Sequence, residues 1–370
     1  DLNTGPLLRV QLIATADNEH VLLVMIHHII ADAWSIKVLM QDLIDLYAAH
    51  RSDRVAELAA LTVQYPDYSV WQRDWLAGEE LERQVRFWRE RLAGAPAVLE
   101  MPTDRPRPPV QTFNGAHAWW RLSSETTVAL RELANREGCT LFMVLISAYA
   151  LLLGRYSRQD DLLVGTPIAG RQHTELENLI GFFVNTLVLR ADFSGQPTFR
   201  EYLQRIKRES LDAFSHQDLP FEKLVEELQP ERDTSRSPLF QAAFILQNTP
   251  NEAAGSFADL QAENVFVEHS NTKFDLTLGV WEDAEGIGGS LEYNTDLFDA
   301  STIERLLEHL TMLLEGIVAN PAAHVGELPM LNDAERQHLL TDLNATELEY
   351  PLDGTMHGLF EQQAAVQPDA

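Results

Sequence analysis

The apolar positions at the start of the chain predict two paired strands followed by a helix. Residues 6–14 and 21–26 are apolar runs separated by residues 16–19, three of which are polar, and this favours a hairpin. The second run is continuously apolar, as is typical of a strand covered on both faces. Between residues 34 and 47 the apolar side chains recur at helical spacing, and Asp32 just before them is a candidate N-cap.

The rest of the chain alternates between predicted helices and strands, which indicates an α/β fold. A proline-rich stretch, residues 102–109, interrupts the pattern, and we place the boundary between two lobes there. The predicted helices are residues 79–92, 124–137, 141–155, 198–214, 221–228 and 300–318. The predicted strands are residues 117–122, 162–166, 242–247, 275–281 and 289–293.

Composition narrows the class of protein. The single cysteine, Cys139, excludes an internal disulfide framework and a cysteine-based zinc cluster, and it fits a reducing, cytoplasmic compartment. The formal net charge of −28 argues against nucleic acid and anionic membranes as partners. The apolar residues 141–153 fall short of the ~20 residues of a membrane helix and predict a core helix, and nothing at the start resembles an export leader.

Candidate chemistry lies just after the predicted hairpin. His27 and His28 end its second apolar run, and Asp32, Trp34 and Ser35 follow. A histidine at a strand end can take the proton of an attacking amine, or can hold the amine or an oxyanion in place. An isolated histidine there is more often a hydrogen-bonded core residue. Metal binding by both histidines and Asp32 is a further alternative, but such a set controls metal geometry poorly.

This stretch resembles the HHxxxDG signature of the condensation domains of nonribosomal peptide synthetases, members of the chloramphenicol-acetyltransferase-like superfamily. Four further segments resemble, in the family's order, its YxDxAxW, GxFVNT, HQDxPFE and RDxSRNPL motifs: residues 65–71, 180–187, 216–222 and 232–239. Five motifs in one order argue against chance. The resemblance extends to about residue 331.

Two residues depart from the family pattern. Ala33 stands where glycine is usual, and alanine adopts a positive φ only with strain, so we expect a right-handed or slightly strained turn. Ser237 stands where asparagine is usual, which is expected to alter a local hydrogen bond. Neither departure removes a catalytic group.

The resemblance implies two chloramphenicol-acetyltransferase-like lobes in a V shape, with the active site in a tunnel between them. Residues 1–108 would be the C-terminal part of the first lobe, residues 109–332 the second lobe, and residues 333–370 a linker and the start of an adenylation domain. The family's RHExLRT motif is absent before the histidines. We therefore expect the first lobe to be incomplete and this stretch to be inactive alone.

The resemblance also assigns roles to the residues of the histidine stretch. His28 would be catalytic, and His27 would be structural or would fix the tautomer of His28. Asp32 is expected to turn away into an ion pair with an arginine, preferably Arg155; a plain N-cap or a charge relay are the alternatives. Two more residues are expected to pack and cap: Trp34 and Ser35.

Four residues elsewhere are candidates for the tunnel. Gly181 and Asn185 could contact the substrate or the pantetheine arm, with a structural hydrogen bond as the alternative. Arg171 could face the tunnel or a carrier phosphate, with a surface salt bridge as the alternative, and Ser235 could touch the substrate. Three neighbouring residues could form a local ion network: Arg232, Asp233 and Arg236.

The function that the resemblance implies is amide formation between a donor acyl or peptidyl thioester and an acceptor aminoacyl thioester. The partners would be upstream and downstream peptidyl carrier domains, which supply the 4′-phosphopantetheine arms, and an adjoining adenylation domain. The domain itself would hold no cofactor and no metal. The alternatives are an acyltransferase acting on a soluble alcohol or amine, which the adenylation-like tail argues against, and a noncatalytic docking domain.

Overall fold

The computed structural model describes residues 2–230, 233–247, 256–257, 260–263, 265, 270–347 and 354–368. The chain divides into two compact units, Asp1–Pro329 and Met330–Ala370. The lobe boundary placed at residue 108 and the domain boundary placed at residue 332 stay predictions.

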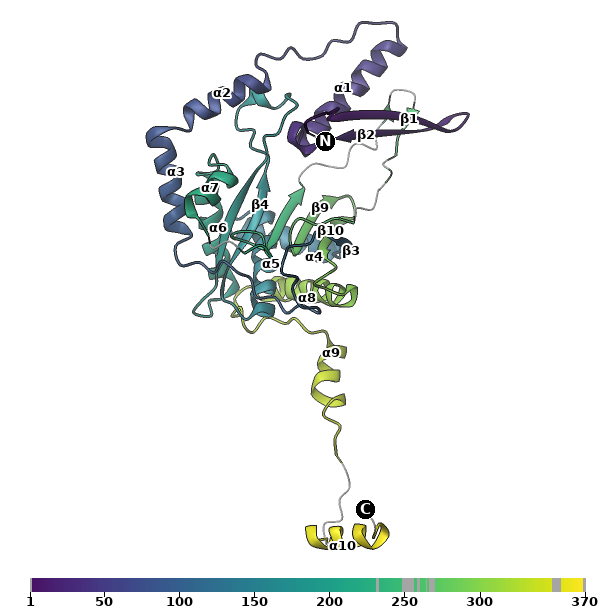
Figure 1. The fold of residues 1–370 in the computed structure, drawn as a ribbon, viewed down its shortest axis with the longest axis vertical. Helices are drawn as coiled ribbons and strands as arrows, with labels where there is room; N and C mark the ends of the chain where they lie inside the picture. The colour runs from purple at the N-terminus through teal and green to yellow at the C-terminus, as the bar shows by residue number, and fades with distance from the viewer. Residues whose placement is uncertain are drawn as a thin grey trace. The chain divides into compact units, whose positions relative to one another are not determined.

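A two-stranded hairpin opens the first unit (Figure 1). β1, Leu8–Ala16, pairs with β2, Glu19–Ile26, in antiparallel register, as predicted. The expectation that β2 is covered on both faces is wrong. None of its eight residues is fully buried, because in the described part of the chain β1 is the only helix or strand with which β2 makes extensive contact, and no such element packs on its faces. A short 3₁₀ turn, His28–Ile30, leads from β2 into α1, Ala33–Arg51.

The main sheet of the first unit is mixed. Its six strands, counted over the described residues, lie in the order β3-β10-β9-β6-β4-β5. β6 runs parallel to both neighbours and the other pairs are antiparallel, so the predicted α/β class is confirmed. The strands are β3 Gly115–Arg121, β4 Asp161–Ile168, β5 Asn185–Asp192, β6 Ala242–Gln247, β9 Leu276–Asp283 and β10 Gly286–Asn294. A separate short pair comprises β7 Ser256–Phe257 and β8 Leu260–Gln261.

The helices with the most contacts to this sheet are α4 Ser124–Arg136, α5 Leu141–Ser157, α6 Phe199–Phe214 and α8 Ala300–Ala319. α5 is the core helix that its apolar sequence predicts, because every residue from 143 to 154 is buried. No single helix in the described part of the chain is long and apolar enough to cross a membrane. The bent pair α4 and α5 together passes that test of length and composition.

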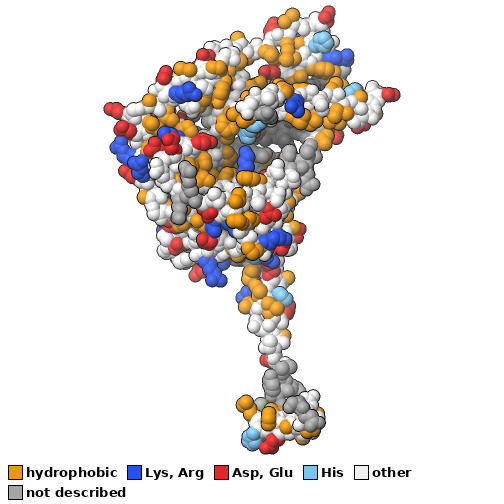
Figure 2. All heavy atoms as spheres, viewed as in Figure 1, with side chains coloured by type: hydrophobic (Ala, Val, Ile, Leu, Met, Phe, Trp, Pro, Cys, Tyr) orange, Lys and Arg blue, Asp and Glu red, His pale blue; other side chains and the backbone are white. Residues whose placement is uncertain are grey.

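Charged side chains of both signs are mixed over the surface shown in Figure 2. On that face, Lys and Arg side chains lie scattered among Asp and Glu side chains. The basic side chains seen there do not merge into one continuous patch. An excess of acidic residues gives the chain its formal net charge of −28.

Two further helices, α2 Tyr65–Trp75 and α3 Gly78–Arg91, follow α1 (Figure 1). The hydrophobic pattern predicts α3 but misses α2. α3 packs against α7, Phe221–Leu228. Trp88 on α3 is 1% exposed, and its Nε1 donates to the carbonyl oxygen of His216 at 2.9 Å. This contact ties α3 to the segment that precedes α7.

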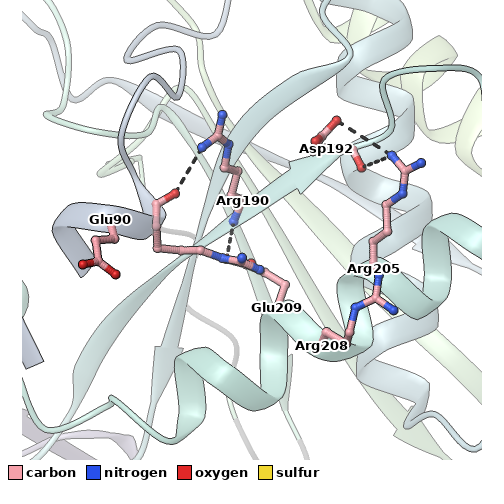
Figure 3. A pocket seen from close by; sticks show the side chains of 7 residues that line it. Glu90, Arg190, Asp192, Arg205, Arg208 and Glu209 are labelled. Carbon is pink, nitrogen blue, oxygen red and sulfur yellow. Dashed lines mark hydrogen bonds and ion pairs between the residues drawn. The ribbon is translucent and has the colours of Figure 1, made fainter. Parts of the chain in front are cut away.

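A charged cluster fastens the C-terminal end of α3 to β5 and α6 (Figure 3). Glu209 is buried, forms an ion pair with Arg91, and accepts from the backbone N–H of Arg190 at 3.1 Å. The Arg190 guanidinium donates to the carbonyl oxygens of Arg91 and Ala93 at 3.1 and 3.0 Å, and it pairs with Asp161 at 2.7 Å. The cluster lines a cavity of about 380 Å³. The buried Glu209 and its partly exposed partners have opposite charges, and their contacts hold the helix end in place.

The second unit is mainly helical where it is described. α9, Asp333–Gln337, begins at the capping residue Asn332 and continues into a π-helical turn, His338–Asp342. α10, Met356–Val366, follows and is capped by Thr355.

Candidate functional site

His28 lies in the 3₁₀ turn between β2 and α1, with an exposed side chain. Its Nδ1 is 2.8 Å from the carbonyl oxygen of Ala31. Because a carbonyl oxygen can only accept a hydrogen bond, Nδ1 carries the proton of the neutral ring and Nε2 keeps its lone pair. The imidazole therefore presents a proton acceptor at Nε2.

His27 precedes this turn and caps it. Its Nδ1 accepts a hydrogen bond from the backbone N–H of Ile29 at 3.1 Å. The tautomer of His28 is set by the Ala31 carbonyl, so the tautomer-fixing role suggested for His27 is wrong. The structural role suggested for His27 stays a prediction, and its contact with the Ile29 N–H is consistent with it.

Asp32 is buried and lies at the N-cap of α1. Its Oδ1 accepts from the N–H of Ser35 at 2.8 Å, and its Oδ2 accepts from the N–H of Phe183 at 3.0 Å. Arg171 Nη2 lies 3.1 Å from Oδ1 and completes a buried ion pair. Burial alone would raise the pKa of Asp32. Hydrogen bonds from Ser35 and Phe183 and the charge of Arg171 outweigh it and hold that pKa below its ordinary value.

The expected pairing of Asp32 with Arg155 is wrong. The Arg155 guanidinium donates instead to the carbonyl oxygen of Leu328 at 2.6 Å. Arg155 lies in the last turn of α5, whereas Arg171 lies in the loop after β4, and that loop reaches Asp32. Asp32 therefore serves both as an N-cap and as the acid of an ion pair with a different arginine.

Two alternative interpretations of the histidine stretch find no support. The hydrogen-bond partners of Asp32 in the described part of the chain do not include His28, so the geometry is not that of a charge relay. Over the same residues, no group of three or more His, Cys, Asp and Glu side chains is arranged to hold a metal ion.

Arg171 is enclosed, so its predicted place in the tunnel or at a carrier phosphate is wrong. Its side chain is 1% exposed. The guanidinium donates to the carbonyl oxygens of Leu176 and Leu179 and to the hydroxyl of Ser35. It also lies over the Phe183 ring, 4.1 Å from the centroid, in a cation–π contact. Each of these contacts is internal to the protein.

Ser35 joins the start of α1 to Gly181. Its buried hydroxyl lies 2.7 Å from Asp32 Oδ1 and 2.8 Å from the Gly181 carbonyl oxygen, and it accepts from the Gly181 N–H at 3.0 Å. A Cβ at position 181 would lie 2.2 Å from the ring of Tyr65. Gly181 is thus buried in a tight junction, which corrects its predicted place in the tunnel. We call Asp32, Ser35, Arg171, Gly181 and Phe183 the clamp.

Trp34 packs over the clamp from α1. Its Nε1 donates to the carbonyl oxygen of Glu177 at 2.8 Å. The guanidinium carbon of Arg171 lies 5.9 Å from the centroid of its ring. These contacts fit the packing role that the sequence suggests.

Asn185 uses its whole amide on backbone groups. Nδ2 donates to the carbonyl oxygens of Gln217 and Leu219, at 2.8 Å each. Oδ1 accepts from the N–H groups of Phe221 and Thr186, at 3.0 and 2.8 Å. Asn185 thus bridges β5 and the start of α7, and this structural role takes the place of the suggested tunnel contact.

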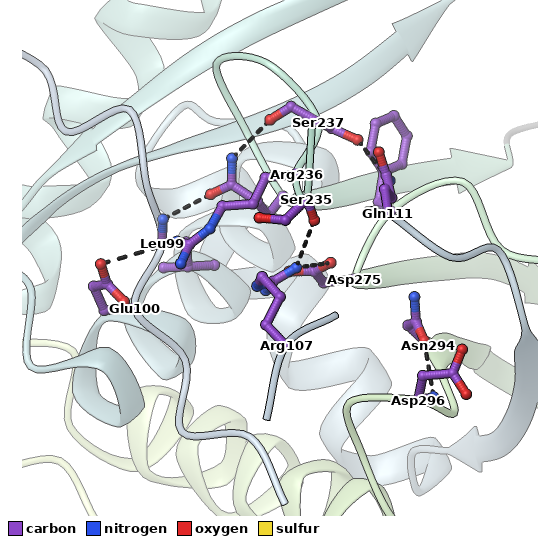
Figure 4. A network of polar contacts seen from close by, with 12 residues as sticks. Leu99, Glu100, Arg107, Gln111, Ser235, Arg236, Ser237, Asp275, Asn294 and Asp296 are labelled. Carbon is purple, nitrogen blue, oxygen red and sulfur yellow. Dashed lines mark hydrogen bonds and ion pairs between the residues drawn. The ribbon is translucent and has the colours of Figure 1, made fainter. Parts of the chain in front are cut away.

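Ser235 lies in a polar network beside the main sheet (Figure 4). Its hydroxyl donates to Asp233 at 2.6 Å. Its carbonyl oxygen accepts from Arg107 at 3.3 Å. Arg107 in turn pairs with the buried Asp275. The hydrogen-bonding groups of Ser235 serve this network, and the suggested substrate contact gains no support.

Part of the suggested ion network is present in the same region. Arg236 lies 3.4 Å from Asp233, while Arg232 is outside the described residues. The hydroxyl of Ser237, the second departure from the family pattern, accepts from Gln111 Nε2 at 3.1 Å. This bond joins Ser237 to a residue 126 positions earlier in the chain. The expected change in a local hydrogen bond stays a prediction.

Comparison with known proteins assigns the family. The Condensation domain family model matches residues 1–340 of the chain. This chain belongs to the condensation domain family. Over 373 residues it is 48% identical to one of the linear gramicidin synthase proteins of Brevibacillus parabrevis. The match covers 100% of this condensation domain chain and 7% of that protein.

Solved structures similar to this condensation domain support the expected fold class. A holo four-domain nonribosomal peptide synthetase bound to AMP and glycine is 27% identical with a TM-score of 0.84, covering 100% of this chain and 29% of that one. The X-domain in complex with OxyB from teicoplanin biosynthesis is 32% identical with a TM-score of 0.81. That match covers 90% of this chain and 75% of that one. The chloramphenicol-acetyltransferase-like class is confirmed.

The family departure at Ala33 causes no strain in this condensation domain. Ala33 is the first residue of α1 and is not among the residues with positive φ. Of the two turns that the sequence leaves open, the right-handed one is present, and it is one that alanine adopts freely.

Sequence reasoning missed the contacts of Tyr65 and Phe182. The Tyr65 hydroxyl donates to the carbonyl oxygen of Phe182 at 2.9 Å. The Phe182 ring packs against the imidazole of His28, with centroids 5.2 Å apart and planes at 76°. Both residues fall in segments that resemble family motifs, so the signal for their importance is in the sequence. The contacts span 117 and more residues, and no local pattern reveals them.

Proposed function

We propose that this condensation domain joins a donor acyl or peptidyl thioester to the amine of an acceptor aminoacyl thioester. Each thioester would be carried on the phosphopantetheine arm of a carrier domain. The amine nitrogen forms a bond to the donor carbonyl carbon, and the carbon–sulfur bond of the donor breaks. One amine proton ends on the departing thiol, so the reaction needs no other reagent.

The observation that carries this proposal is the hydrogen bond between His28 Nδ1 and the Ala31 carbonyl oxygen. In the neutral form of the ring, this bond leaves Nε2 as a hydrogen-bond acceptor. Nε2 can take the amine proton as a general base, or can accept a hydrogen bond that aims the amine lone pair at the thioester carbonyl. Both roles use the same atom.

The clamp would contribute to this reaction only by holding His28 in position. Its ion pair, Asp32 with Arg171, is buried, and the Ser35 hydroxyl is engaged by neighbouring groups. A buried and satisfied network holds one loop conformation. We assign these residues to holding the turn that carries His28.

The partners that we propose are upstream and downstream carrier domains and an adjoining adenylation domain. The support is the similarity of the whole chain, Met330–Ala370 included, to a four-domain nonribosomal peptide synthetase. The linear gramicidin synthase protein of Brevibacillus parabrevis likewise matches over the whole of this chain. A free-standing acyltransferase would not need the second unit.

A docking domain without catalysis is the second candidate. The observation that favours it is the similarity to an X-domain whose structure was solved in complex with OxyB. The acceptor geometry at His28 Nε2 favours catalysis instead, because a docking surface has no use for it.

Product analysis with loaded carriers separates these functions. The full-length protein is mixed with a donor carrier bearing an acyl thioester and an acceptor carrier bearing an aminoacyl thioester. We expect the acceptor carrier to gain the mass of the donor acyl group. Acylation of a free amine but never of the carrier-bound one would instead indicate the soluble-acceptor enzyme. If neither the carrier-bound amine nor the free amine is acylated, a docking function without catalysis would be favoured.

A further inference from the structure

The imidazole of His28 is held on two sides. Nδ1 is fixed by the Ala31 carbonyl oxygen at 2.8 Å, and the ring packs edge-to-face with the half-buried Phe182. Edge-to-face aromatic contacts are directional as well as apolar, so they favour one relative orientation of the two rings. Phe182 thereby restricts how the imidazole can turn.

The backbone that carries Phe182 is itself fixed on both sides. The Tyr65 hydroxyl donates to the Phe182 carbonyl oxygen at 2.9 Å. The next N–H, of Phe183, donates to Asp32 at 3.0 Å, and the preceding carbonyl oxygen, of Gly181, accepts from the Asp32 N–H at 3.1 Å. With the backbone fixed, the Phe182 ring can move away from its neighbour only by rotation about its own χ angles.

The constraint links segments that lie far apart in the sequence. Asp32 lies four residues after His28. Its carboxylate nevertheless binds Phe183, which lies 151 positions after Asp32 in the chain and is the neighbour of Phe182. The same clamp that holds the histidine turn therefore also delivers the aromatic ring to it. Turn and ring are positioned as one piece.

We propose that Phe182 is a positioning residue for His28, and that its ring keeps Nε2 aimed at the reacting amine. The inference rests on the proposed role of His28. Loss of the ring frees rotation of the imidazole and lowers the fraction of molecules with Nε2 correctly placed. Because His28 Nε2 acts on the bound amine, the loss appears in kcat and not in KM.

Three variants of the full-length protein test the inference. Phe182→Leu keeps an apolar side chain but removes the ring, and we expect kcat for condensation to fall about 10-fold with an unchanged KM for the acceptor carrier. Phe182→Tyr keeps the ring and should retain the parental kcat. The matched control is Phe87→Leu, which removes another aromatic contact to a histidine: Phe87 stacks on His216 with centroids 3.7 Å apart. We expect it to leave kcat unchanged.

A spectroscopic readout separates positioning from a general structural effect. With ¹⁵N-labelled histidine, the His28 signals, assigned by their loss in His28→Ala, should show a ring protonated at Nδ1. Phe182→Leu should shift them towards a mixture of tautomers, and Phe87→Leu should not. If Phe182→Leu leaves these signals unchanged, the inference is overturned, whether kcat falls or not. This readout does not depend on condensation, so it stands even if His28→Ala condenses at the parental rate and the proposed function fails.

Discussion

At the scale of single residues, His28 is exposed while the residues that hold its turn are buried. Asp32 and Ser35 are 3% and 0% exposed, and the side chain of Arg171 is 1% exposed. A buried support around an exposed group fixes its position without closing access to it. The clamp is best understood as the frame of His28.

The ion pair within the clamp gives a direct prediction. Asp32→Asn leaves the Arg171 charge buried without its partner, and loss of one member of a buried pair costs about 3 kcal/mol. We expect the free energy of unfolding, measured by urea denaturation, to fall by about that amount. Condensation should also slow, because the turn that carries His28 loosens.

Asp67→Asn is the matched control for this prediction. Asp67 also serves a helix start, accepting from the N–H of Gln64 at 2.8 Å, but it is exposed and forms no ion pair in the described part of the chain. Its replacement should cost at most about 1 kcal/mol. Equal losses for the two variants would show that Asp32 is no more than a cap.

The sequence predicts the local part of this site and misses the long-range part. His28, the N-cap at Asp32 and the capping of Ser35 all lie within one short stretch, where motif and helix-start rules apply. The sequence does not identify the arginine that pairs with Asp32, because Arg155 and Arg171 are both far from Asp32 in the chain. Only the path of the loop after β4 decides that Arg171 is the partner.

At the scale of elements, the segment between η2, Thr174–Leu176, and β5 is where early and late parts of the chain meet. The backbone carbonyl oxygen of Gly181 forms hydrogen bonds with the Ser35 hydroxyl and with the Asp32 N–H. The Tyr65 ring packs against the Cα of Gly181. The junction works only if the residue at this position has no side chain.

Gly181→Ala should therefore destabilise the first unit. Its Cβ would lie 2.2 Å from the Tyr65 ring, and overpacking of this kind costs about 2 kcal/mol. Gly279→Ala in β9 is the control, because the nearest atoms to its Cβ would be 3.8 Å away, at ordinary contact distance. We expect its effect to stay within about 0.5 kcal/mol. Thermal unfolding of both variants checks the difference, and a neutral Gly181→Ala would contradict the packing described here.

Most strands of the main sheet and most of its flanking helices follow the hydrophobic pattern, and two of the elements that it misses, α2 and β5, are missed for physical reasons. α2 begins with a proline in its first turn and carries aromatic residues that resemble a motif, which hides its helical spacing. β5 has only three consecutive buried apolar residues between Asn185 and Arg190, and it lies at the edge of the sheet. The continuous run of apolar residues predicts burial on both faces of β2. That prediction fails because burial depends on neighbours that the pattern of one strand does not contain.

At the scale of the whole molecule, the formal net charge of −28 opposes the compact state through self-repulsion. Raising NaCl from about 0.1 to about 1 M shortens the Debye length from about 10 to about 3 Å. Exposed ion pairs weaken too, but each is worth little, so relief of the repulsion wins. We expect the midpoint of thermal unfolding at pH 7 to rise. Nearer the sequence pI of about 4.7 the rise should shrink, and a midpoint that falls with salt at pH 7 would contradict this balance.

Family membership and the geometry at His28 together lead to one central claim, that His28 Nε2 promotes amide formation between carrier-bound substrates. The most direct test is the single-turnover rate constant for transfer from a loaded donor carrier to a loaded acceptor carrier. His28→Ala should lower it by about 100-fold. His27→Asn, which keeps an acceptor for the Ile29 N–H, should stay within about twofold of the parent. A His28→Ala protein that condenses at the parental rate would contradict the claim.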